Sequence, residues 1–206
     1  MSILEEIVLS KREEVAERKE LCPIKLLERS LYFTTRGVSL KQYLLRKDRV
    51  GIIAEFKRRS PSRGDLLVHA SVEEISIGYM QAGASALSIL TDKKYFGGSG
   101  EDLTIARRFN FCPVLRKDFI VDEYQLFEAK SWGADAVLLI AAILDKDALV
   151  RLAKRAVDLG LEVLFEVHSE RDLAKLPSTG VEIVGVNNRD LDTLEVSLET
   201  SRELVS

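Results

Sequence analysis

Six short apolar runs recur along the chain from residue 50 onward. Four of them show little alternation between polar and apolar positions, which is typical of strands buried on both faces. The runs are VGIIAEF (50–56), ALSIL (86–90), CPVLRKD (112–118), AVLLI (136–140), EVLFEV (162–167) and EIVGV (182–186). They predict six β-strands.

Stretches with the apolar spacing of amphipathic helices lie between and after these runs. They cover residues 72–82, 103–109, 124–132, 146–159, 169–176 and 196–205. Several of them reach a glycine just before the next strand, where a left-handed helix cap is expected. The strand centres follow one another at intervals of 20 to 35 residues, which favours parallel α/β architecture.

The number of units suggests part of a barrel. A (β/α)8 barrel normally needs about 250 residues, whereas this chain of 206 residues shows six strand–helix units. We therefore predict an α/β fold of the TIM (β/α)8 type, truncated after about six β/α units.

An extra helical segment precedes the first strand. Ile3, Leu4, Ile7, Val8 and Val15 fall near one face at helical spacing, and a second polar–apolar segment covers residues 24–46. We expect a single partial barrel domain over residues 1–206, with the N-terminal helical extension at 1–48 and the six units at 49–206.

Composition and charge limit the classes of protein to which this chain can belong. Thirty Lys and Arg residues against 33 Asp and Glu leave a net charge of −3, so neither nucleic acid nor an anionic membrane is an expected partner. The longest apolar run, residues 136–144, is too short to cross a bilayer. Cys22 and Cys112 are the only cysteines, which favours a cytoplasmic protein without a disulfide framework.

Polar residues interrupt four strand ends that such a fold brings together. Glu55, Lys57 and Ser60 stand at the end of the first strand, Lys117 at the third, Glu166 at the fifth and Asn187 with Arg189 after the sixth. In these barrels the active site lies at the carboxyl ends of the strands. Each residue alone is more often a solvated rim residue or part of an ion pair, but their coincidence at one mouth predicts a site.

Other chemistry has weaker support. His69 and His168 lack neighbours at metal-ligand spacing, and we expect no metal site. Asp118, Asp135 and Asp190 are interpreted as caps or ion pairs rather than magnesium ligands, and Arg107 with Arg108 as solvated. The segment YFGG (95–98) is either a turn with an aromatic lid on the core or a stacking wall for an aromatic substrate. The chain has no GxGxxG and no GxSxG motif.

Six motifs in order carry a family resemblance. They are IIAEFKRRSPSRG (52–64), ALSILTDKKYFGGS (86–99), PVLRKDFIVDEYQ (113–125), GADAVLLIAAIL (133–144), LEVLFEVHSERDL (161–173) and GVNNRDLDTLEV (185–196). Together they closely resemble the indole-3-glycerol phosphate synthases of tryptophan biosynthesis, which also carry a helical segment ahead of the barrel.

The resemblance implies a reaction without cofactor or metal. The small-molecule substrate would be the phosphorylated anthranilate–ribulose adduct 1-(2-carboxyphenylamino)-1-deoxyribulose 5-phosphate, and the products indole-3-glycerol phosphate, CO2 and water. By motif, Lys117 matches the principal general acid and Glu166 the general base. Lys57 matches the lysine that contacts the substrate carboxylate, and a share of Lys57 in the acid role stays open.

The remaining matches are supporting residues. Glu55 and Asn187 match residues that orient the lysines and the substrate hydroxyls. Phe96 and Phe119 match apolar walls around the anthranilate ring, and Ser60 and Arg189 match polar contacts to the substrate.

The family pattern continues beyond this chain with two further strands that supply most of the phosphate site. We therefore expect the 206-residue chain to be poorly active or prone to self-association through open barrel edges. Two alternatives stay open: another phosphate-binding barrel enzyme such as phosphoribosylanthranilate isomerase, and a non-catalytic fragment or scaffold.

Overall fold

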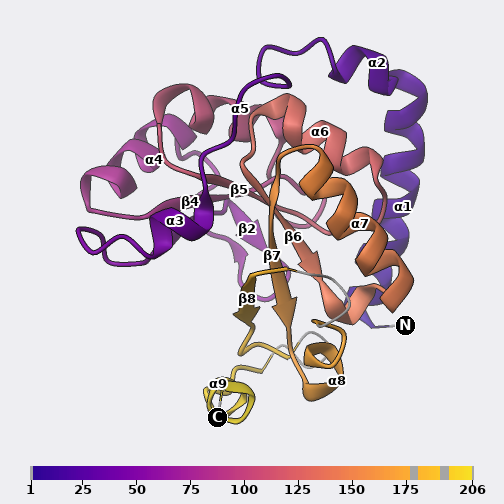
Figure 1. Ribbon diagram of the computed structural model, residues 1–206, viewed down its shortest axis with the longest axis vertical. Coiled ribbons are helices and arrows are strands. Elements are labelled where there is room, and N and C mark those ends of the chain that lie inside the picture. The colour runs from indigo at the N-terminus through magenta and orange to yellow at the C-terminus, as the bar shows by residue number, and fades with distance from the viewer. Residues whose placement is uncertain (1, 177–180, 191–194, 206) are drawn as a thin grey trace.

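A computed structural model describes residues 2–176, 181–190 and 195–205. Its main feature is a six-stranded parallel sheet in the order β1-β4-β5-β6-β7-β8 (Figure 1). The strands are β1 (Ile53–Phe56), β4 (Ala86–Leu90), β5 (Val114–Lys117), β6 (Ala136–Ile140), β7 (Glu162–Val167) and β8 (Ile183–Val186). The curled sheet is part of a barrel of the (β/α)8 type, so the predicted fold class is confirmed.

The helices follow the strands as the sequence predicts, with shifts at their ends. They are α4 (Val72–Gln81), α5 (Gly100–Phe109), α6 (Tyr124–Trp132), α7 (Lys146–Asp158), α8 (Glu170–Leu173) and α9 (Glu199–Val205), and the 3-10 turn η1 (Ala141–Ile143) follows β6. Side chains of Ser71, Ser99, Asp145 and Ser169 accept a backbone N–H of the first turn and begin four of these helices. Gly133, at φ 93°, ends α6 in the left-handed conformation.

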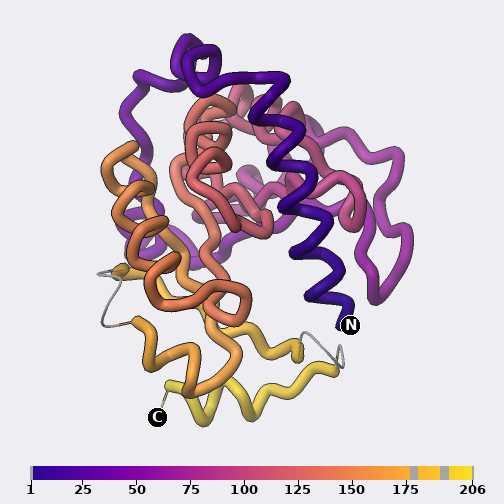
Figure 2. Tube along the Cα trace, turned by 90° about the vertical axis from the view of Figure 1, so that its right-hand side faces the viewer, coloured from indigo at the N-terminus to yellow at the C-terminus, as the bar shows by residue number. Residues whose placement is uncertain are grey.

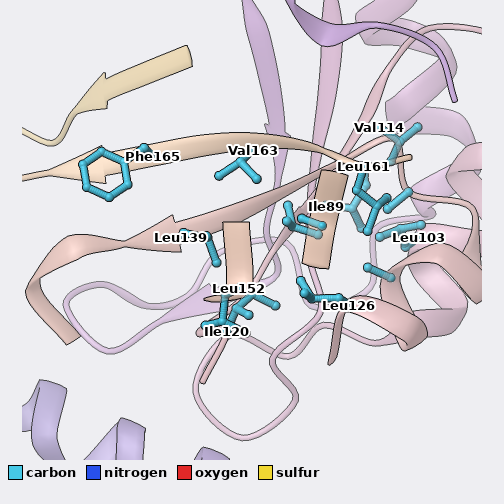
Figure 3. Close-up of a cluster of buried hydrophobic side chains, with 14 of the residues drawn as sticks. Ile89, Leu103, Val114, Ile120, Leu126, Leu139, Leu152, Leu161, Val163 and Phe165 are labelled. Carbon is cyan, nitrogen blue, oxygen red and sulfur yellow. The ribbon is translucent and has the colours of Figure 1, made fainter. Parts of the chain in front are cut away.

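Alternate residues of the strands belong to two different apolar clusters, one on each face of the sheet. Leu87, Leu139 and Phe165 belong to a cluster shared with helices α5 to α7 (Figure 3). The neighbouring positions Ala86, Leu115 and Ala136 face the barrel interior instead. Because side chains alternate along a strand, the same interior face continues toward the carboxyl ends, where the polar residues lie.

The N-terminal segment contacts the barrel at two places. Helix α1 (Ile3–Leu21) runs along one side of the molecule (Figure 2). Residues 24–46 contain only two short helices, α2 (Ile24–Leu27) and α3 (Leu40–Leu44). Leu40 of α3 is fully buried against Ala86, Leu115 and Ala136 at the amino ends of the strands. The short helix α3 thus fills the interior at the end opposite the polar residues.

Two features of the sheet concern its margins. Strands β1 and β8 each pair on one side only within the described residues. After β1 the chain forms a small antiparallel hairpin of β2 (Arg59–Ser60) and β3 (Gly64–Asp65), which the sequence pattern does not reveal. Among the described residues, no helix is both long and apolar enough to span a membrane.

Candidate active site

A pocket of about 650 Å³ lies at the carboxyl ends of the parallel strands. Every residue singled out from the sequence for the site lines it: Glu55, Lys57, Ser60, Phe96, Lys117, Phe119, Glu166, Asn187 and Arg189. Residues 191–194 of the last motif lie outside the described residues. The structure therefore brings together side chains that the sequence spreads over more than 130 residues.

Glu55 joins the two lysines of the pocket. Its Oε1 lies 2.7 Å from Lys57 Nζ, and its Oε2 lies 3.7 Å from Lys117 Nζ. All three side chains are between one quarter and one third exposed, so they are held in place while remaining open to the pocket. The ion pairs expected of strand-end residues are present, and they form part of the pocket wall.

Glu166 approaches from another strand of the same sheet, β7. Its Oε1 accepts a hydrogen bond from Asn187 Nδ2 at 3.2 Å. Asn187 is itself held by its backbone N–H, which donates to Val167 O, and by its Oδ1, which accepts the Arg189 N–H at 3.0 Å. The loop after β8 thus orients an amide onto the carboxylate.

Apolar side chains form the rest of the pocket wall. The rings of Phe96 and Phe119 lie 6.0 Å apart in a tilted arrangement. Ile3, Leu4 and Ile7 of helix α1 complete the wall. Helix α1 is therefore part of the candidate site, a placement that its amphipathic pattern does not reveal.

A buried lysine attaches α1 to this site. Lys11 is 1% exposed, and its Nζ lies 2.8 Å from both Asp92 and Glu14 and 3.0 Å from Asp118. Burial alone would lower the pKa of Lys11, but the three carboxylates outweigh it and raise the pKa to about 12. Asp92 Oδ1 in turn accepts the backbone N–H of Phe96 at 3.3 Å.

A second buried cation lies directly beneath. Arg116 is fully buried and donates to Asp118, Glu128 and the Thr91 hydroxyl. Burial alone would raise the pKa of Asp118, yet the charges of Arg116 and Lys11 lower it to about 2. Asp118, between Lys117 and Phe119 in the chain, is thereby fixed by cations on both sides.

Several expectations for other polar residues can now be compared with the structure. Asp118 and Asp135 take part in ion pairs, as interpreted from the sequence. The expectation that Arg107 is solvated is wrong, because its Nη1 lies 2.7 Å from Asp135 and its side chain is 11% exposed. Arg107 is largely covered on α5, so its guanidinium group reaches Asp135 at the amino end of β6. Within the described residues no group of three or more metal-ligating side chains is placed to hold a metal ion.

His168 is a neighbour of Glu166 that sequence reasoning missed. Its Nε2 lies 3.4 Å from Glu166 Oε1. The signal was present in the two-residue spacing, which places both side chains on the same side of an extended segment.

This fold and pocket define a class of protein: a barrel enzyme of the (β/α)8 type, with acidic and basic side chains gathered at the strand ends. The sequence profile named "Indole-3-glycerol phosphate synthase" matches residues 4–206. The chain belongs to the indole-3-glycerol phosphate synthase family.

Relatives carrying that name match nearly the whole chain. The protein from Bacteroides thetaiotaomicron is 49% identical over 202 residues, covering 98% of this chain and 77% of the relative. The protein from Caldanaerobacter subterraneus subsp. tengcongensis is 44% identical, with 98% and 78% covered. The protein from Kineococcus radiotolerans is 42% identical, with 99% and 76% covered.

Proposed function

We propose that this chain is an indole-3-glycerol phosphate synthase, a carbon–carbon lyase of tryptophan biosynthesis. It converts 1-(2-carboxyphenylamino)-1-deoxyribulose 5-phosphate into indole-3-glycerol phosphate, CO2 and water. The observation that carries the proposal is the pair of lysines bridged by Glu55 in one pocket with Glu166. Family membership supplies the substrate.

The chemistry needs an acid first. The ring carbon that bears the carboxylate attacks the ribulose carbonyl, which is a poor electrophile until its oxygen is protonated or hydrogen-bonded. Lys117 is the proposed general acid for this step. Loss of CO2 then restores the aromatic ring.

The last step needs an acid and a base together. A hydroxyl leaves as water while a proton leaves the adjacent carbon, and Glu166 is the proposed base for that proton. Lys57 contacts the substrate carboxylate, Glu55 orients both lysines, and Asn187 orients Glu166 and the substrate hydroxyls. Lysine and glutamate side chains supply all of this acid–base chemistry, so the proposal requires no cofactor.

The charge and shape of the pocket support this substrate. Four cationic side chains line it, Lys57, Arg63, Lys117 and Arg189, against the two carboxylates of Glu55 and Glu166. An excess of positive charge suits a ligand that carries both a carboxylate and a phosphate. Phe96 and Phe119 would enclose the anthranilate ring, while Ser60 and Arg189 would contact its polar groups. We place the reaction in the cytoplasm, as the cysteine content suggests.

The test is a fluorescence assay for indole-3-glycerol phosphate with the purified chain. We expect Glu166→Gln and Lys117→Ala each to lower kcat by about 10²- to 10⁴-fold, the usual contribution of a general acid or base. Glu170→Gln is the matched control: it makes the same change of charge at an exposed position four residues away.

Two results would contradict the proposal. One is turnover that survives both substitutions at the wild-type rate. The other is a folded wild-type chain that neither forms the product nor binds the substrate. Isomerisation of a phosphoribosyl substrate instead of indole formation would favour the alternative barrel enzyme.

A further inference from the structure

His168 presents a buried imidazole whose ring nitrogens have no hydrogen-bond partner within the described part of the chain. The ring lies between two carboxylates: Nε2 is 3.4 Å from Glu166 Oε1, and Nδ1 is 4.0 Å from Asp172 Oδ2. Its side chain is 12% exposed. Leaving a buried polar group without a partner is costly, so such a group in a folded protein calls for an explanation.

The two carboxylate oxygens of Glu166 have different contacts. Asn187 Nδ2 and His168 Nε2 both approach Oε1, and neither of them is placed on Oε2. Since Glu166 lines the pocket, this arrangement leaves one carboxylate oxygen for a ligand while the other is held from behind. Hydrogen bonds at catalytic groups are often long in the ligand-free enzyme and shorten when substrate binds.

We propose that His168 is a positioning residue for Glu166. Its Nε2–H donates to Glu166 Oε1, holds the carboxylate in place and directs Oε2 toward the substrate proton. This inference rests on the proposed function, because Glu166 is the base only in that reaction. The geometry between His168 and Glu166, however, can be tested without any turnover.

The charged groups around His168 decide what its titration will report. Glu166 faces it from β7 and Asp172 from α8, where the His168 backbone N–H donates to Asp172 at 3.1 Å. Lys175 lies on the far side of Asp172, at 3.5 Å, and donates to the Ala141 and Leu144 carbonyls at η1. Two anions thus border the ring directly, and the nearest cation in this group is separated from it by Asp172.

The first experiment follows the two histidines of the chain by NMR, in the wild type and in Glu166→Gln. Removing a negative charge in contact with the ring disfavours the imidazolium, so the titration midpoint of the His168 signal should fall. His69 is exposed and serves as the internal control, whose midpoint should not change. An unchanged His168 midpoint would overturn the proposal, whatever the activity of the chain.

The second experiment compares pH profiles of kcat for two variants. His168→Leu removes the donor, so the acid limb of the profile should move to higher pH. His168→Gln retains an N–H donor and should restore most of the wild-type profile. Equal displacement in both variants, or a loss of kcat without any displacement, would show that His168 only fills space.

These two readouts separate the inference from the proposed function. A wild-type chain without turnover, together with a shifted His168 midpoint in Glu166→Gln, would contradict the proposed activity and leave the contact established. Normal turnover with an unshifted His168 midpoint would support the proposed activity and contradict the contact between His168 and Glu166.

Discussion

Gly98 stands in the loop between β4 and α5 where no larger residue fits. A Cβ at this position would overlap the carbonyl group of Leu90, which is backbone and has little room to move. We expect Gly98→Ala to lower the free energy of unfolding by about 1–3 kcal/mol, the usual cost of overpacking. Urea denaturation measures the change.

Gly78 provides the opposite case for comparison. It lies inside helix α4, and a Cβ there would meet no atom within 4 Å. Because glycine weakens a helix interior, Gly78→Ala should raise the free energy of unfolding by about 0.5–1 kcal/mol. If both variants lost stability equally, the close approach at Gly98 would not be the cause.

At the scale of single residues, strand-end residues were predictable and long-range partners were not. Glu55, Lys117 and Glu166 interrupt apolar runs, and parallel topology alone brings such interruptions to one end of the sheet. Lys11 looks like any solvated lysine in a charged helix, because its partners Asp92 and Asp118 lie far along the chain, just after strands β4 and β5. Only the packed structure shows that this charge is buried. The roles assigned to the site residues stay predictions.

At the scale of elements, helix α1 depends on Lys11 for its attachment. Replacing that side chain by the apolar Met leaves Asp92 and Asp118 buried with one partner fewer. Breaking a buried ion pair from one side costs about 3–5 kcal/mol, and we expect Lys11→Met to lower the free energy of unfolding by that amount. Chemical denaturation followed by circular dichroism measures it.

Lys19→Met is the matched control on the same helix. Lys19 also pairs with a carboxylate, Asp122 at 2.7 Å, but its side chain is 45% exposed. An exposed ion pair contributes less than about 1 kcal/mol, so this variant should remain near the wild type. A Lys11 variant as stable as the Lys19 variant would show that the buried cluster does not hold the helix.

Elements with a continuous apolar run or with clear boundaries were predictable within a few residues. Strands β4, β6 and β7 and helix α6 match their predicted ranges, because each is a continuous buried run or has clear boundaries. The two short helices of segment 24–46 were not predictable, since contacts with the barrel hold them rather than their own sequence pattern. Two-residue strands such as β2 are too short for any alternation to reveal.

At the scale of the whole molecule, the two outer strands of the sheet are open to pairing. Within the described residues β1 and β8 each have a free side, and Ile52 beside β1 is 55% exposed. Open sheet edges are templates for pairing with another chain. We expect the 206-residue chain to form larger species as its concentration rises, measured by sedimentation velocity.

A charge placed on the edge should reduce this association. Val184, on β8, is 38% exposed, and Val184→Lys should shift the distribution toward the monomer. Val150→Lys on α7 places the same charge at a valine of equal exposure outside both edge strands and should have no effect. A chain that remains monomeric at every concentration would contradict the prediction.

The attachment of α1 also has a consequence for the order of events on the ribosome. Arg18 of α1 pairs with Glu128, which is 110 residues further along the chain. At about 5–20 residues per second, roughly 5–20 seconds pass between the synthesis of the two. Most helical stability in proteins comes from tertiary packing, so we expect α1 to stay undocked until β5 and α6 have emerged. Ile3, Leu4 and Ile7 are thus translated before the rest of the pocket, but they reach their places only after a segment about 110 residues further along the chain has been made.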